Sequence, residues 1–159
     1  MKLIEMPAAA FEPFMADLKA RYTADQRQAN LLSTEAANRF VDNQWAQILP
    51  LGRATPDHHF FQFVDDSHTV RGESWLFVHG ETRMAFIYEL FLHEEARGQG
   101  LGRQLLDALT EFAANHGAQS LGLNVFAHNE RARALYSSYG FNEVSSNMVM
   151  RLKSGGNRS

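Results

Sequence analysis

One turn in the middle of the sequence carries residues suited to binding a phosphate group. Gly98, Gly100 and Gly102 occupy three of five consecutive positions, and Arg97 and Arg103 flank them. Glycine loses more backbone entropy on folding than any other residue, so three of them in one turn need a physical reason. Backbone N–H groups and the dipole at a helix N-terminus attract anions, and the arginines would add charge-assisted hydrogen bonds. A tight turn with close helix packing is the alternative explanation.

The spacing excludes two common nucleotide-binding loops. A P-loop ends in Gly-Lys followed by Ser or Thr, whereas here Gly102 is followed by Arg103 and Gln104. The dinucleotide-binding fingerprint needs a third glycine where this chain has Arg103. That fingerprint also expects an acidic residue at the end of the next strand to bind the ribose, where this sequence reads FAHN. Neither loop fits.

Two motifs together resemble the GNAT N-acetyltransferase superfamily. Residues 97–102 match R/Q-x-x-G-x-G/A, the superfamily's acetyl-CoA pyrophosphate loop between a strand and a helix. A second pattern, N-x-x-A-x-x-L-Y-x-x-x-G-F, follows at Asn129, Ala132, Leu135, Tyr136, Gly140 and Phe141. The two motifs span residues 86–141, whereas the N-terminal part matches only the superfamily's general layout. The resemblance implies acetyl-CoA as cosubstrate, no metal, and direct transfer of acetyl to an amine.

The resemblance also implies which residues bind the cosubstrate. The backbone of one strand would pair with the pantetheine arm as an added strand does, and that strand would splay from the next one. The loop amides would hold the pyrophosphate, and Asn129 would contact the arm as well as cap the following helix. The implied set is Leu90, Phe91, Leu92, Arg97, Gly98, Gln99, Gly100, Leu101, Gly102, Arg103 and Asn129.

Two residues are predicted to carry the chemistry. The resemblance places Tyr136 beside the thioester sulfur, where a phenol would protonate the departing thiolate, although an aromatic core residue is the alternative. The attacking amine must lose a proton, and relatives that acetylate protein N-termini use a glutamate where this chain has Asn124. Glu89 lies in an otherwise apolar strand, where a carboxylate is costly unless it is paired or functional. Glu89 or ordered water is therefore the predicted base.

The hydrophobic pattern predicts the elements that must position these residues. Helices are expected over 9–32, 33–49, 101–116 and 129–140. The apolar face of the helix over 33–49 is expected to consist of Phe40, Val41, Trp45, Ile48 and Leu49. Strands are expected over 2–7, 59–66, 70–80, 82–93 and 120–127, followed by a strand pair or bulged strand over 141–153. This order predicts an α/β fold, in which a mixed sheet has helices on both faces. The resemblance implies the GNAT fold, whose central sheet is mostly antiparallel with splayed parallel strands.

Composition limits the other classes of protein. With 159 residues and no linker, one domain over 1–153 is expected, followed by a flexible tail over 154–159. The chain has no cysteine and no recognisable export signal, which favours the cytoplasm. A net charge of −3 argues against nucleic acid, and no apolar run is long enough for a membrane span. The sequence leaves a homodimer open.

The histidines show no metal-binding spacing, so no metal site is expected. His59 or His128 is a candidate for lining the acceptor pocket or relaying a proton, although a surface position explains either one. The predicted function is transfer of acetyl from acetyl-CoA to a primary amine, of a small molecule or of a peptide. A catalytically silent acyl-CoA-binding module is the alternative from another class.

Overall fold

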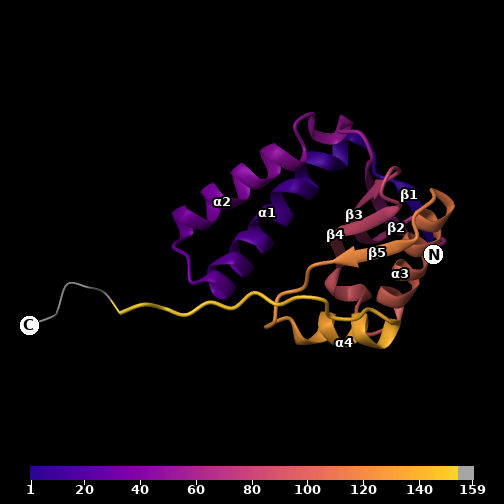
Figure 1. The fold of residues 1–159 in the computed structure, drawn as a ribbon. Helices are drawn as coiled ribbons and strands as arrows, with labels where there is room; N and C mark the ends of the chain where they lie inside the picture. The colour runs from indigo at the N-terminus through magenta and orange to yellow at the C-terminus, as the bar shows by residue number, and fades with distance from the viewer. Residues whose placement is uncertain (154–159) are drawn as a thin grey trace, which may run out of the picture.

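A computed structural model describes residues 1–153 as a central sheet with helices on both faces (Figure 1). The expected tail over 154–159 lies outside the described residues. Two short 3-10 turns, η1 (Gly52–Ala54) and η2 (Glu94–Ala96), join longer elements. These elements are β1 (Lys2–Glu5), α1 (Ala8–Asn30), α2 (Thr34–Ile48), β2 (His58–Val64), β3 (Val70–His79), β4 (Met84–Leu92), α3 (Leu101–Asn115), β5 (Ser120–Leu123) and α4 (Glu130–Tyr139).

The five strands form one sheet in the order β1-β2-β3-β4-β5. The first four strands are antiparallel, and β5 runs parallel to β4. A parallel pair needs a crossover, which α3 supplies between β4 and β5. The predicted mixed, mostly antiparallel sheet is therefore confirmed.

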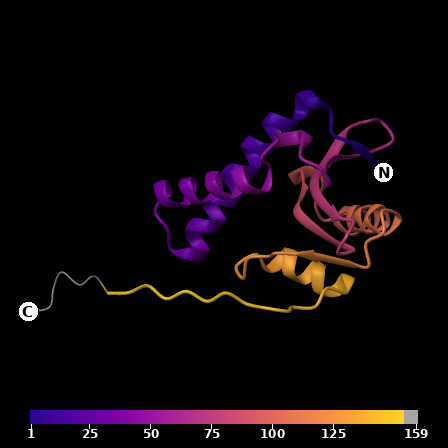
Figure 2. The same ribbon diagram turned by 45° about the horizontal axis from the view of Figure 1, so that its top comes forward.

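Helices pack on both faces of this sheet because its strands present apolar side chains to both. On one face, α1 buries Phe11, Phe14 and Leu18 against Phe60 and Trp75 of the sheet. On the other face, α3 buries a stripe of leucines against β2, β3 and β4, and α4 adds partly buried residues. Figures 1 and 2 show the α1–α2 hairpin on one side of the sheet and α3 with α4 on the other. The predicted two-sided arrangement is confirmed.

The middle of β4 contains a β-bulge. Trp75 is opposite Glu89, whereas the next residue of β3, Leu76, is opposite Ile87, so Tyr88 is the extra residue. A bulge bends its strand and changes where the neighbouring side chains point. The pairing of β5 with β4 ends directly before this residue, since the last parallel partners are Ile87 and Leu123. The predicted splay of these two strands begins here.

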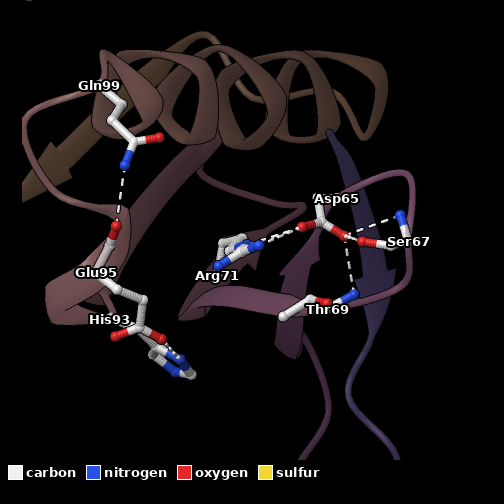
Figure 3. A network of polar contacts seen from close by, with 7 residues as sticks. All are labelled: Asp65, Ser67, Thr69, Arg71, His93, Glu95 and Gln99. Carbon is white, nitrogen blue, oxygen red and sulfur yellow. Dashed lines mark hydrogen bonds and ion pairs between the residues drawn. The ribbon is translucent and has the colours of Figure 1, made fainter.

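The turn between β2 and β3 is closed by one carboxylate, seen in Figure 3. Asp65 Oδ1 accepts hydrogen bonds from the backbone N–H groups of Ser67 and Thr69, both at 2.9 Å, and Arg71 Nε donates to Oδ2 at 2.8 Å. The hydroxyl of Ser67 also donates to Asp65. The hydrogen bonds from Ser67 and Thr69, followed by Arg71, hold the pKa of Asp65 well below its usual range. This turn therefore has a specified geometry.

The first residues of α2 and α4 are capped as their sequences indicate, but the buried face of α2 differs from the predicted one. Ser33 caps α2 by accepting the N–H of Ala36 at 3.1 Å, and Asn129 caps α4 by accepting that of Ala132 at 3.4 Å. The expected stripe of α2 included Phe40, which is 46% exposed, whereas Ala37 and Val41 are buried. The prediction for Phe40 is wrong because α2 packs mainly on α1, which leaves room only for a narrow stripe.

The C-terminal part of the chain differs most from the prediction. Residues 141–153 were expected to form a strand pair or a bulged strand, but they form no strand and run away from the body as an extended chain (Figures 1 and 2). The strand expected over 120–127 is also shorter, because β5 ends at Leu123. Within residues 1–153, no helix is long and apolar enough to cross a membrane.

Candidate active site

The three glycines of the turn before α3 have two different structural roles. Gly98 and Gly100 have φ of +75° and +74°, which favours glycine because it lacks a Cβ. Gly102 instead allows close packing: a Cβ there would lie 3.1 Å from Leu135 Cδ2 on α4 and 3.6 Å from Leu92 Cδ1 on β4. The alternative explanation from the sequence therefore applies in both its parts, with the tight turn at the first two glycines and the close helix packing at the third.

We expect Gly102→Ala to destabilise the fold by about 1 kcal/mol net. Displacing Leu135 from the added methyl group costs about 1–3 kcal/mol, which exceeds the roughly 1 kcal/mol that alanine gains over glycine in a helix. Urea unfolding followed by circular dichroism measures this change. Gly80→Ala is the matched control, since no described atom lies within 4 Å of a Cβ built there. Equal stabilities of the two variants would contradict the packing role of Gly102.

The turn leaves a row of backbone donors unused. Among the described residues, no acceptor is found for the N–H groups of residues 98–103, and the first backbone bond into α3 runs from Gln104 N to Gly100 O at 3.3 Å. A Cβ built at Gly98 or Gly100 has no described atom within 4 Å, so the space above both residues is open. The turn therefore offers exposed donors at the positive end of a helix dipole.

The polar side chains of the turn are partly engaged elsewhere. Gln99 Nε2 donates to Glu95 O at 2.9 Å (Figure 3), and Arg97 Nε donates to Leu92 O at 3.1 Å. The guanidinium of Arg103 lies 5.3 Å from the ring centre of Tyr139. These contacts hold the turn in place and involve its side chains rather than the N–H groups of residues 98–103.

A cavity of about 110 Å³ lies at the point where β4 and β5 part. It is lined by Ile87, Tyr88, Glu89, Leu90, Leu123, Asn124, Val125, Asn129, Ala132 and Tyr136. Both predicted catalytic residues and two of the predicted cosubstrate-binding residues, Leu90 and Asn129, are thus in one cavity. The glycine turn follows the end of β4 through η2, so the cavity and the exposed amides belong to the same end of the sheet.

Phe91 and Leu92, also predicted to contact the cosubstrate, do not line the cavity. Phe91 lies under the guanidinium of Arg21, at 3.7 Å from ring centre to Cζ. The side chain of Leu92 packs against the core under α3. The predicted role of these two residues rests on their backbone.

Glu89 points into the cavity with one charged partner. Its Oε2 lies 3.5 Å from Nη2 of Arg21, and its Oε1 accepts the N–H of Leu90 at 2.9 Å. Burial raises the pKa of Glu89, and the positive charge of Arg21 partly opposes this rise. A carboxylate with a raised pKa is a better proton acceptor than an ordinary glutamate once it is ionised.

Tyr136 is held in the cavity wall by packing. Its ring meets that of Phe141 edge-on, with ring centres 5.7 Å apart. Burial raises the pKa of Tyr136 to about 12, and the charge of Glu89 contributes to the rise. The phenol is therefore a weaker acid than an alkyl thiol, whose pKa is about 8.5. A proton bound to Glu89 removes that negative charge, so the phenol becomes more acidic once the carboxylate is protonated.

Two side chains of α1 that the sequence analysis did not single out lie near these groups. Arg21 contacts Glu89, and Asp25 is close enough for its charge to raise the pKa of Glu89. His128 Nε2 lies 2.8 Å from Asp25 Oδ1, which connects α1 to the loop before α4. The only sequence signal was the four-residue spacing of Arg21 and Asp25, which puts both on one helix face.

The other candidate histidine does not approach the cavity. His59 packs against Phe61, Phe112 and His116 on the α3 face of the sheet. Burial and the neighbouring His116 lower its pKa. Across residues 1–153, no group of three or more His, Cys, Asp or Glu side chains is placed to hold a metal ion.

Comparisons with known proteins agree with this geometry. The family model of the Acetyltransferase (GNAT) family matches residues 17–141. An uncharacterized N-acetyltransferase of Bacillus subtilis, YycN, is 33% identical over 146 residues, which are 89% of this chain and 92% of YycN. The crystal structure of YycN superposes with a TM-score of 0.89 and 31% identity over 96% of this chain and 99% of that chain.

Two further proteins are similar over part of the chain or in fold alone. A mycothiol acetyltransferase of Jonesia denitrificans is 42% identical over 88 residues, which are 55% of this chain and 28% of that protein. The structure of AAC(6')-Iy in complex with a CoA bisubstrate analog shares the fold, with a TM-score of 0.58 and 14% identity. It covers 96% of this chain and 98% of that one.

Proposed function

The chain belongs to the GNAT acetyltransferase family, and from this premise we propose that it transfers the acetyl group of acetyl-CoA directly to the primary amine of a small molecule. One observation carries the proposal. The cavity that contains Glu89 and Tyr136 is lined by residues 87–90 of β4, and β4 leads through η2 into the exposed amides before α3. A pyrophosphate at the amides and a thioester in the cavity would lie on one continuous path.

The residues present fit acetyl-CoA. The amides of residues 98–103 have no described acceptor, and a side chain at Gly98 or Gly100 would fill the space that a pyrophosphate needs. Beyond Ile87 the edge of β4 is no longer paired with β5, so its backbone is available to an extended pantetheine arm. Leu90 N–H already donates to Glu89, so the arm and this carboxylate would compete for that donor.

The proposed reaction has three linked steps. The amine nitrogen attacks the thioester carbonyl, and Glu89, directly or through water, accepts the proton that the nitrogen loses. The carbon–sulfur bond then breaks, and the CoA thiolate takes the phenolic proton of Tyr136. Protonation of Glu89 precedes this transfer, because it removes one cause of the raised pKa of Tyr136. The chain has no cysteine for an acetyl-enzyme, which favours direct transfer.

The surroundings of the cavity favour a small cationic acceptor over a folded protein. Its volume of about 110 Å³ leaves little room beyond an acetyl group and an amine. Near the cavity, the carboxylates of Glu89 and Asp25 face the single positive charge of Arg21, which lies 3.5 Å from Glu89, and the surplus of negative charge attracts an ammonium ion. A peptide amine remains the second candidate acceptor, since the α1–α2 hairpin would form its groove.

A thiol assay tests the proposal with little background. Because the chain contains no cysteine, every thiol that appears in the reaction belongs to CoA. We expect CoA release from acetyl-CoA in the presence of small di- or polyamines, with the acetylated amine found by mass spectrometry. If the protein binds acetyl-CoA and acetylates neither small amines nor peptide amines, it is a binding module and the proposal fails.

Arg21 provides a prediction about pH dependence. Its charge opposes the burial that raises the pKa of Glu89, so Arg21→Gln should raise that pKa further. Glu89 must be ionised to accept a proton. As the pH falls, the variant should therefore begin to lose activity at a higher pH than the natural protein does. The pH profile of kcat measures this shift. At a pH well above the pKa of Glu89 in the variant, kcat should change little.

Lys19→Gln is the matched control, because it removes another positive charge from α1 that pairs with Asp42 instead. Its pH profile should coincide with that of the natural protein. If the profile of Arg21→Gln also coincides with that of the natural protein, either Glu89 does not accept the proton or Arg21 does not affect the pKa of Glu89.

A further inference from the structure

The two walls of the cavity are not joined by backbone pairing. One wall consists of residues 87–90 of β4, and the other contains Leu123, Asn124, Val125 and Asn129. The ladder between β4 and β5 ends at Ile87 and Leu123, and within residues 1–153 no backbone hydrogen bond joins residues 125–129 to β4. Side chains must therefore fix the distance between the walls.

Helix α1 holds the β4 wall through Arg21. The guanidinium Cζ lies 3.7 Å from the ring centre of Phe91, and Nη2 lies 3.5 Å from Glu89 Oε2. Glu89 and Phe91 are two residues apart on one strand, so their side chains leave the same face of the sheet. One residue of α1 thus contacts two residues of β4.

Two other residues of α1 hold the opposite wall. Asp25 Oδ1 lies 2.8 Å from His128 Nε2, and the ring centre of Tyr22 lies 5.9 Å from that of Phe126. An ionised carboxylate can only accept, so Nε2 of His128 is the donor. In the described part of the chain, this is the one side-chain hydrogen bond between α1 and the residues after β4. The ring of His128 also stacks on that of Phe126, with centres 5.5 Å apart.

The turn that α1 contacts leads directly into the cavity. The N–H of Asn129 donates to Phe126 O at 3.0 Å, which closes a turn around His128. Asn129 lines the cavity and caps α4, the helix that carries Tyr136. Figures 1 and 2 show the chain after β5 bending toward the α1–α2 hairpin before it enters α4. A displacement of His128 would therefore shift one wall of the cavity.

We propose that Asp25 is a positioning residue that sets the width of the cavity through His128. Arg21 holds β4, and Asp25, four residues later on the same helix face, holds the turn before α4. The helix fixes the spacing of these two side chains, so α1 acts as a brace between the walls. This inference rests on the proposed function, in which the thioester lies between Glu89 and Tyr136.

A distance measurement tests the brace without any need for activity. The chain has no cysteine, so spin labels attach only to introduced ones, at Ala127→Cys in the turn and Glu111→Cys on the exposed face of α3. Pulsed electron paramagnetic resonance should give one narrow distance, which broadens or shifts in Asp25→Ala. Asp42→Ala is the control, since it breaks a contact of α1 with α2 through Lys19 instead, and should change nothing. An unchanged distance distribution in Asp25→Ala would overturn the proposal.

The kinetics should separate positioning from charge. Asp25→Ala should lower kcat by about tenfold or more, because the thioester loses its alignment, whereas KM for acetyl-CoA should change less. Asp25→Asn keeps an oxygen that accepts from His128, so it should retain most of kcat. Measurement well above the pKa of Glu89 removes the influence that the charge of Asp25 has on that pKa. Equal losses in the two variants would contradict a role through this hydrogen bond.

A double variant tests whether Asp25 acts through His128. His128→Phe keeps a ring against Phe126 but has no donor, so it should lower kcat as Asp25→Ala does. The double variant should be no slower than either single one, because both changes break one contact. Losses that multiply would mean that the two side chains act separately, against the proposal. A protein that acetylates no amine would refute the proposed function, and the distance measurement would still decide whether the brace exists.

Discussion

Tyr136→Phe is expected to lower kcat at neutral pH by about 100-fold or more, while the affinity for acetyl-CoA changes little. The substitution removes only the hydroxyl, so the ring keeps its packing against Phe141. Burial holds the pKa of this tyrosine at about 12, so the phenol is protonated throughout the working range and can act only as a donor. Steady-state kinetics at saturating acetyl-CoA measure the effect.

Tyr139→Phe is the matched control on the same helix. The Tyr139 hydroxyl donates to Asp107 Oδ1 at 2.8 Å and lies outside the cavity, so its loss should cost about 1 kcal/mol of stability and leave kcat intact. An unchanged kcat for Tyr136→Phe would show that another group or water protonates the thiolate. Equal losses in both variants would point to a structural effect of α4.

Gly100→Val is expected to weaken acetyl-CoA binding at least tenfold. Valine at a φ of +74° is strained, and its side chain would occupy the space above the exposed amides. The first effect lowers stability, and the second prevents a pyrophosphate from reaching the main chain. Titration calorimetry with acetyl-CoA measures the second effect, after circular dichroism has established that the variant is folded.

Gly117→Val separates strain from access. Gly117 follows the other end of α3 with a φ of +90°, and no described atom lies within 4 Å of a Cβ built there. The strain should therefore be similar, at about 1–2 kcal/mol, whereas acetyl-CoA binding should be unchanged. If both variants bind acetyl-CoA as the natural protein does, the loop before α3 is not the pyrophosphate site.

The sequence predicted those parts of the site that depend on local patterns. The glycines before α3, the cap at Asn129 and the position of Tyr136 lie in contiguous motifs, so their spacing alone indicates a turn followed by a helix. The bulge at Tyr88 has no comparable signature. It arises from how β4 fits against β3, and only the register of the two strands reveals it.

The sequence did not predict the features that depend on contacts between distant parts of the chain. Arg21 and Asp25 reach the cavity from α1, more than sixty residues before Glu89, and nothing in their local sequence specifies that partner. The prediction of a strand pair or bulged strand over 141–153 was wrong, because backbone pairing needs a neighbour that a local pattern cannot identify. The acidity of Tyr136 likewise depends on burial and on Glu89, and both follow from the packing of α4 beside β4.

A crystal structure of the protein with acetyl-CoA tests the central claim most directly. The account predicts the pyrophosphate within hydrogen-bond distance of the amides of residues 98–103, the arm along β4 beyond Ile87, and the thioester between Glu89 and Tyr136. A cosubstrate bound away from the loop before α3, or a thioester remote from Tyr136, would contradict it.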